Sequence, residues 1–277
     1  MAYQTVLVPL PMEEGSDALL GVATTLAEQH QAHLIGLHVV PMLNLPYQEI
    51  SASVSLEFQN ARKALAEAMQ GRFAKHTEAG GFVSEWREVV SHEPSNERQL
   101  IEQANTSDLI VMGQPADPAR RGSRGSTSAH LLAACGRPVL LVAPDHGAPA
   151  VGDRVFIAWD GQRASTRALF AALPLLCRAD AVRLQRINAP SRDRRGVAGT
   201  AEMLAETLSL HGVNADVQHA DVRNADVGTE LLAYASDWEA DVIVAGCFEQ
   251  GGLRETLFGS TTRHLLCNAS VPLLMSA

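Results

Sequence analysis

The chain has 277 residues, of which 46% are hydrophobic and 19% charged, enough for one large folded domain or two of ordinary size. Acidic residues outnumber basic ones by 31 to 22, giving a formal net charge of −9, and neither half is basic, which excludes a protein that binds nucleic acid through a basic surface. No apolar run approaches the roughly 20 residues of a membrane span, and the four scattered cysteines form no CxxC pair. We therefore expect a cytoplasmic protein with neither nucleic acid nor membrane as a partner.

The first half of the chain alternates short apolar, β-branched runs with longer amphipathic segments. The short runs predict strands near residues 5–10, 33–40, 83–89, 109–112 and 138–142. The longer segments predict helices near residues 15–31, 51–79, 94–105 and 126–135. The predicted strands are nearly continuous in apolar residues, which is typical of a parallel sheet with helices on both faces.

The same order of elements recurs after a short segment rich in Gly, Ala and Pro at residues 145–153, which is typical of a linker. Strands are predicted near residues 154–159, 182–187, 215–219, 242–245 and 271–275. Helices are predicted near residues 162–178, 197–211, 226–238 and 260–268. We place one domain at residues 1–146 and a second at residues 152–277.

The two halves are also similar in sequence. Residues 125–143 (GSTSAHLLAACGRPVLLVA) and 259–277 (GSTTRHLLCNASVPLLMSA) share nine of 19 positions. Just upstream, residues 107–113 (SDLIVMG) correspond to residues 240–246 (ADVIVAG). The repeat length is about half the chain, which predicts two tandem α/β domains. In doubly wound sheets of this kind, ligands bind at the carboxyl ends of the strands.

The residues that follow the fourth strand of the second half are of a kind that binds phosphate. Gly246 directly follows that strand, and Gly259, Ser260 and Thr261 open the next helix. Free N–H groups and hydroxyls at a helix N-terminus favour an anion. The alternative is purely structural: Gly246 relieves a tight strand exit and Ser260 is an ordinary helix cap.

The spacing Gly-x2-(Gly)-x9-Gly-Ser on a repeated strand–helix domain resembles the nucleotide-binding signature of the universal stress protein family, and the resemblance covers essentially the whole chain. It implies a flavodoxin-like, five-stranded parallel sheet of order 3-2-1-4-5 in each domain. It also implies ATP or AMP, with or without Mg²⁺, at the strand ends of those members that bind a nucleotide.

Carried over position by position, the resemblance assigns nucleotide contacts in the second domain. Asp160, at the end of the first strand, corresponds to the family's aspartate beside the adenosine, and Ile187, ending the second strand, to the backbone contact with adenine. The phosphate contacts fall on Gly246, Gly259, Ser260 and Thr261. Glu249 stands where the family has its second glycine, and we expect its carboxylate to repel a triphosphate.

The first domain departs further from this signature. Pro11 stands at the position of Asp160, and the loop after Gly113 reaches Gly125 and Ser126 one residue too early. Two prolines stiffen this loop and three arginines charge it, so we interpret it as a solvated surface loop, with an anion site as the alternative. Any nucleotide is therefore expected in the second domain.

No catalytic motif accompanies these residues. The sequence has no GxxxxGK[ST] loop, no GxSxG or HExxH motif and no zinc-ligand spacing, so we expect a binding protein of the stress response and not an enzyme. The rival hypotheses are a slow ATPase or autophosphorylating protein, with Ser260 or Thr261 as acceptor, and a nucleotide-independent interaction or small-ligand protein. Cys247 and the matching histidines His130 and His264 are interpreted as packing or capping residues, with redox and ligand roles as alternatives.

The last strands of the two halves, residues 138–142 and 271–275, are short and apolar. Exposed edges of this kind are a liability unless they are covered. We expect them to pair within one chain, which predicts a pseudo-two-fold arrangement of the halves. Further homodimerisation is left open, and the sequence identifies no protein partner.

Overall fold

The computed structural model describes residues 1–10, 16–40, 52–91, 96–114, 127–147, 151–187, 200–222, 226–247 and 259–277. Each half contributes five strands. They are β1 (Thr5–Pro9), β2 (His33–Val40), β3 (Ser84–Val90), β4 (Leu109–Gly113), β5 (Val139–Val142), β6 (Arg154–Trp159), β7 (Ala181–Ile187), β8 (Ala215–Ala220), β9 (Val242–Gly246) and β10 (Leu273–Ser276). Each predicted strand is present within about two residues of its expected bounds.

The helices lie between these strands as predicted. They are α1 (Ser16–His30), α2 (Ala52–Thr77), α3 (Glu97–Ala104), α4 (Thr127–Ala134), α5 (Arg163–Ala171), α6 (Leu173–Leu176), α7 (Thr200–Ser209), α8 (Val227–Asp237) and α9 (Ser260–Asn268). One prediction was wrong: the single helix expected over 162–178 is divided at Ala172. Pro174 lies in the first turn of α6, where its missing N–H is tolerated, whereas inside one long helix it would break the hydrogen-bond ladder.

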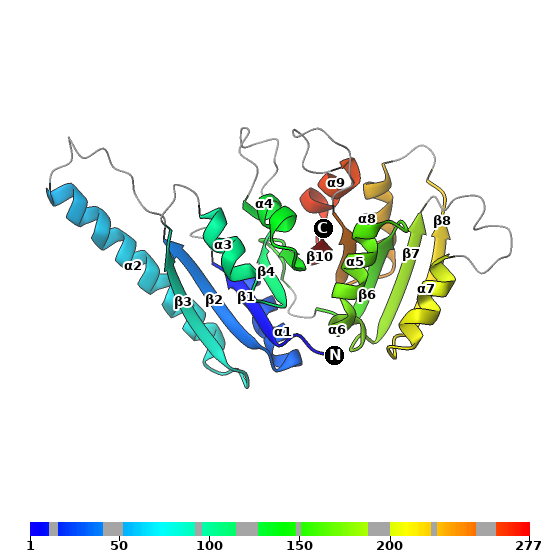
Figure 1. Ribbon diagram of the computed structural model, residues 1–277, viewed down its shortest axis with the longest axis horizontal. Coiled ribbons are helices and arrows are strands. Elements are labelled where there is room, and N and C mark those ends of the chain that lie inside the picture. Colours follow the sequence, from blue (N-terminus) through cyan, green and yellow to red (C-terminus); the bar gives the residue numbers. More distant parts are fainter. Residues whose placement is uncertain are drawn as a thin grey trace.

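The ten strands of the described chain form one sheet in the order β3-β2-β1-β4-β5-β10-β9-β6-β7-β8. Within each half all pairs are parallel and the order is 3-2-1-4-5, which confirms the flavodoxin-like prediction. The two halves meet where β5 pairs antiparallel with β10, with Leu140 opposite Leu274, so the predicted pseudo-two-fold pairing is also confirmed. Figure 1 shows the result, with β3 and β8 at the two outer ends and the C-terminus near the centre.

Two layers of helices cover the sheet, and each has a hydrophobic core that runs through both halves. One core joins α1 and α2 with α5, α6 and α7 over side chains such as Val6, Val8, Val155 and Ile157. The other joins α3 and α4 with α8 and α9 over alternating positions of the same strands, such as Leu7 and Phe156. Side chains of successive strand residues point to opposite faces, so the run of apolar residues in each inner strand feeds both cores.

The outer strands depart from the expected continuous apolar pattern. Residues of β3 and β8 are exposed or only partly buried, because each strand pairs with a neighbour on one side only. Charged side chains at such an edge also discourage pairing with another chain. In the described residues, no helix combines the length and apolarity that crossing a membrane requires.

The repeated Ser/Ala-Asp dipeptide has a structural role in both halves. The Asp108 carboxylate accepts hydrogen bonds from the backbone N–H groups of Gln4 and Thr5, at 2.8 and 3.1 Å. The Asp241 carboxylate likewise accepts from the backbone N–H groups of residues 152–154, at 2.8–3.1 Å. Each aspartate therefore ties the start of the fourth strand of its half to the start of the first, which fixes the centre of each half of the sheet.

A contact between the halves lies on the face of α1, α5 and α6. The Tyr3 hydroxyl donates a hydrogen bond to the Ala171 carbonyl oxygen at 2.9 Å, and the Tyr3 ring meets His30 edge-on, with ring centroids 5.0 Å apart. His30 is buried, and neither ring nitrogen has a hydrogen-bond partner among the described residues. Burial, and next the charge of Arg178, lower the pKa of His30 to about 4, so the imidazole is neutral at this junction.

Candidate functional site

The carboxyl edge of the second half gathers the residues that the sequence analysis selected. Strands β9, β6 and β7 are parallel neighbours in that order, so their carboxyl ends meet at one edge of the sheet. Gly246 ends β9, Asp160 directly follows β6 and Ile187 ends β7. Ser260 and Thr261 open α9, the helix that follows β9. The nucleotide role of these residues stays a prediction, and Glu249 lies outside the described residues, as do Pro11, Gly125 and Ser126 of the first half.

Asp160 is exposed and organises the start of α5. Its Oδ1 atom accepts hydrogen bonds from the Gln162 backbone N–H at 2.8 Å and from the Ser165 hydroxyl. Among the described residues, no donor reaches Oδ2. One carboxylate oxygen therefore fixes the β6–α5 turn, while the other is available to a ligand hydroxyl.

Gly246 is required by packing. A Cβ atom at this position would lie 2.3 Å from the Ser165 backbone nitrogen and 2.6 Å from the Ala164 carbonyl carbon. Because these are backbone atoms at the start of α5, they cannot move aside as a flexible side chain could. Close packing is therefore sufficient to explain the glycine, without a phosphate contact. The missing side chain of Gly246 lets the start of α5 lie against the end of β9.

The N-terminus of α9 differs from that of its neighbour α8 in how it is capped. Gly259 is its N-cap residue in an extended conformation, and no side chain of the described residues caps the helix. A Cβ atom at Gly259 would meet nothing within 4 Å, and Ser260 beside it is exposed. By contrast, the neighbouring α8 is capped by Asp226, whose carboxylate accepts from the Thr229 backbone N–H at 3.1 Å. Among the described residues no side chain occupies the first N–H groups of α9, which are of the kind that binds an oxyanion.

His264 joins α8 to α9. Its Nδ1 lies 3.1 Å from Asp226 Oδ2, and its Nε2 lies 3.3 Å from the Thr229 hydroxyl. The hydroxyl is also 3.4 Å from the same carboxylate oxygen, so the three groups form a compact clamp between helices and not a linear proton relay. Gly228 makes room for the imidazole, because a Cβ there would lie 2.7 Å from the His264 Cβ. The capping interpretation fits His264, and the side chain of His130 lies outside the described residues.

Two further residues behave as core groups. Cys247 is 1% exposed, and burial, with the nearby Cys135, raises the pKa of its thiol to about 12, so it packs as an apolar side chain. His38 is buried beside Trp86, with ring centroids 6.2 Å apart, and burial lowers its pKa. In the described residues, no group of three or more His, Cys, Asp or Glu side chains is placed to hold a metal ion.

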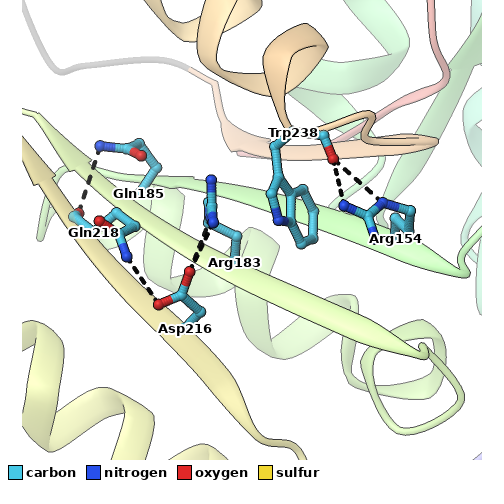
Figure 2. Close-up of polar contacts among 6 residues, drawn as sticks. All are labelled: Arg154, Arg183, Gln185, Asp216, Gln218 and Trp238. Carbon is cyan, nitrogen blue, oxygen red and sulfur yellow. Dashed lines mark hydrogen bonds and ion pairs between the residues drawn. The ribbon is translucent and has the colours of Figure 1, made fainter.

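The sequence analysis missed Trp159 and Arg186, which lie at the same carboxyl edge on the face of α5 and α7. The Arg186 guanidinium carbon is 4.7 Å from the centroid of the Trp159 ring, and both side chains are buried. The available signal was alternation: in β7, Val182, Leu184 and Arg186 share one face, so the charge occupies a core-facing position. Figure 2 shows the other face of this strand, where Arg183 pairs with Asp216 and Gln185 donates to the Gln218 carbonyl.

The chain is similar over its whole length to solved structures. The match to a universal stress protein from Archaeoglobus fulgidus DSM 4304 covers 98% of this chain and 97% of that protein, with 18% identity and a TM-score of 0.77. The match to a functionally unknown protein from Pseudomonas aeruginosa PAO1 covers 99% of this chain and 92% of that protein, with 16% identity and a TM-score of 0.60. These likenesses show the fold. No protein with a curated description matches the sequence.

Sequence comparison with protein families gives a more specific result. The universal stress protein family matches this chain twice, over residues 2–143 and over residues 153–276. The two matches correspond to the two five-stranded halves of the sheet, which meet at β5 and β10. The chain therefore belongs to the universal stress protein family, as a tandem of two family domains.

Proposed function

We propose that this protein is a cytoplasmic stress-response protein that binds an adenine nucleotide, ATP or AMP, in its second half without turning it over. The observation that carries the proposal is the N-terminus of α9 beside Gly259 and Ser260, which no side chain of the described residues caps and which lies at the same edge as Asp160 and Ile187. Phosphate oxygens would accept from the free N–H groups of α9. Asp160 Oδ2 would accept from a ribose hydroxyl, and the Ile187 backbone would contact the base.

The electrostatics of the second half limit the affinity. Glu249 adds a negative charge to the loop that joins β9 to α9, and the chain as a whole carries a net charge of −9. The free N–H groups of α9 must offset this repulsion. Removal of the charge in Glu249→Gly is therefore expected to strengthen ATP binding. Mg²⁺ would reduce the same repulsion by neutralising part of the triphosphate charge.

The decisive variant is Gly259→Asp, because an aspartate at the N-cap position would occupy the N–H groups that the phosphates need. It should weaken ATP binding about ten-fold or more, since a hydrogen bond to a charged group contributes roughly 1.5–3 kcal/mol and several are lost. It should not lower stability, because aspartate is a favourable N-cap residue and the position has space for a side chain.

Isothermal titration of the parent and the variant with ATP and AMP measures this, with urea unfolding as the check on stability. Asn96→Asp is the matched control: it adds the same charge at the N-cap position of α3, in the first half. Unchanged ATP affinity in Gly259→Asp would contradict the phosphate site. If the parent protein gives no heat of binding at millimolar nucleotide, the nucleotide-independent alternative is favoured.

The absence of turnover is tested separately by release of inorganic phosphate and by transfer of labelled phosphate to the protein. We expect neither above background. His264, on the same helix as the proposed phosphate contacts, is held in the clamp with Asp226 and Thr229. Turnover that disappears in Gly259→Asp, or label on Ser260 or Thr261, would show that the protein is an enzyme.

A further inference from the structure

A cavity of about 310 Å³ lies in the second half between the C-terminal ends of α8 and α9. Its floor is apolar and is made by Leu232 and Ala235 of α8, by Ile243 near the start of β9 and by Val271 just before β10. These are the amino ends of the strands, whereas the nucleotide contacts are expected at the carboxyl ends. The proposed function therefore uses none of these residues.

The rim of this cavity is polar and suits a cation. Its polar side chains can all accept hydrogen bonds, and they are Ser236, Glu239, Asn268 and Ser270. No lysine, arginine or histidine of the described chain lines the cavity. Glu239 is exposed, and among the described residues its carboxylate forms no ion pair. The C-terminal ends of α8 and α9 add the negative ends of two helix dipoles, so the charges at the cavity favour a positively charged group.

The backbone at Glu239 is in an unusual conformation for a residue with a side chain. Its φ is +56°, in the left-handed region, and its N–H donates to the Ser236 carbonyl oxygen at 2.9 Å to end α8. Glycine or asparagine takes this position at the end of a helix with less strain. Thr106, the matching residue of the first half, does not adopt a positive φ. A carboxylate held at a strained position indicates a function for that side chain.

The matching position of the first half carries a guanidinium. Val271 corresponds to Arg137, because each directly precedes a proline whose carbonyl oxygen accepts from the second residue of the fourth strand of that half. The Arg137 guanidinium donates to the carbonyl oxygen of Asn105, the C-cap residue of α3, at 3.0 Å. In the first half, a cation of the chain itself therefore lies at the C-terminus of the helix that precedes β4.

In the second half the end of α8 has a different donor. Trp238 is the C-cap residue, and its carbonyl oxygen accepts from the Arg154 guanidinium at 2.6 and 3.2 Å (Figure 2). Arg154 opens β6 and is not part of the cavity lining. Val271 thus puts a short apolar side chain where the first half has a long cationic one. The space beside Glu239 is left for a cation from outside the chain.

We propose that this cavity binds a small organic cation, with an amidinium or guanidinium group on the Glu239 carboxylate and a flat apolar body over Leu232 and Val271. Two parallel N–H groups of such a cation match the two oxygens of a carboxylate. The cavity has room for one aromatic ring with its cationic group. The site is additional to the nucleotide site and does not depend on it.

The experiment follows the assigned backbone N–H resonances of the ¹⁵N-labelled full-length protein. The probe is benzamidine, and benzamide is its neutral match in size and shape. We expect saturable shifts of the Glu239, Ala240 and Val271 signals with benzamidine at millimolar concentration, and none with benzamide. Equal responses to the two compounds would overturn the proposal. So would the absence of a saturable response to benzamidine, or a response confined to residues away from the cavity.

Two variants test the roles of the carboxylate and of the missing arginine. Glu239→Gln should weaken benzamidine binding about ten-fold or more, because it removes the charge and keeps the shape. Val271→Arg gives the second half the residue of the first, and its guanidinium should occupy the cavity and abolish binding. Glu206→Gln, at an exposed glutamate of α7, is the matched control and should leave binding unchanged. Parent-like binding in Glu239→Gln, or in a folded Val271→Arg, would overturn the proposal.

Independence from the nucleotide site is measured with the same proteins. ATP binding should be unchanged in Glu239→Gln, and benzamidine binding unchanged in Gly259→Asp. A protein that binds benzamidine but not ATP would contradict only the proposed function. Displacement of benzamidine by one equivalent of bound ATP would overturn the inference of a separate site.

Discussion

The two halves of the sheet have the same strand order, yet they differ at their carboxyl edges. The second half has Trp159 stacked on a buried arginine and a Gly246 closely covered by the start of α5. At the matching positions the first half has Leu10, the neutral His38 and Gly113, whose missing Cβ leaves open space. The inner strands, and the backbone hydrogen bonds of Asp108 and Asp241, are the same in both copies. The copies differ where strands end and helices begin, so the fold tolerates substitutions there.

This comparison separates what a repeat keeps from what it changes. Residues that hold neighbouring strands together face constraints from both sides, because any change there is felt across the whole sheet. Residues after the strand ends are constrained only locally, and they can diverge into a binding site in one copy and a plain surface in the other. The junction of the halves also loses its symmetry: Tyr3 of the first half donates to Ala171 of the second.

The largest expected effect comes from breaking the junction of β5 and β10. Leu274 is fully buried, faces Leu140 across this pair and belongs to the core shared by the halves. Leu274→Ala should lower the free energy of unfolding by roughly 2–5 kcal/mol through lost burial and the cavity left behind. Urea unfolding followed by circular dichroism measures it, with Leu210→Ala, at a position 87% exposed, as the control. A loss no larger than that of the control would mean that the junction contributes little to stability.

The next effect is a dependence on pH at the same junction. His30 has a pKa of about 4 in the folded protein and 6.5 as its ordinary value, so the unfolded chain binds its proton more readily. The corresponding stability is present above pH 6.5 and is lost as the pH falls towards 4, by on the order of 2–3 kcal/mol. His30→Leu should flatten this part of the stability curve, measured by urea unfolding at several pH values. An unchanged slope between pH 4 and 6.5 would contradict the assignment.

The smallest effect compares the two matching glycines directly. Gly246→Ala should destabilise the protein by roughly 1–3 kcal/mol, because its Cβ would overlap backbone atoms of α5. Gly113→Ala should change the stability by less than about 0.5 kcal/mol, since nothing lies within 4 Å of the added atom. Thermal unfolding of the two variants side by side measures the difference. Equal costs would show that the halves do not differ here.

The sequence predicted which residues lie at the candidate site, but not which contacts they make there. The family resemblance placed Asp160, Ile187, Gly246 and Ser260 at or just beyond the ends of the correct strands. It could not show that Asp160 also holds the start of α5, or that Gly246 is required by the Ser165 backbone. These contacts join segments that local pattern does not connect. Arg186 was missed because β7 also contains Arg183 and Gln185, and only the tertiary structure shows that these two side chains lie on the other face while Arg186 faces the core.

The sequence by itself determined the α/β class, the two copies and the bounds of nearly all strands, because hydrophobic periodicity and turn residues act locally. It also predicted the pairing of the last strands, since two short apolar edges must be covered. The tertiary structure alone decided the register of β5 and β10, the break before α6 and the asymmetric contact of Tyr3. It also decided the burial of Arg186 under Gly161. These features depend on which side chains meet across distant segments, and packing settles that only when the whole sheet has formed.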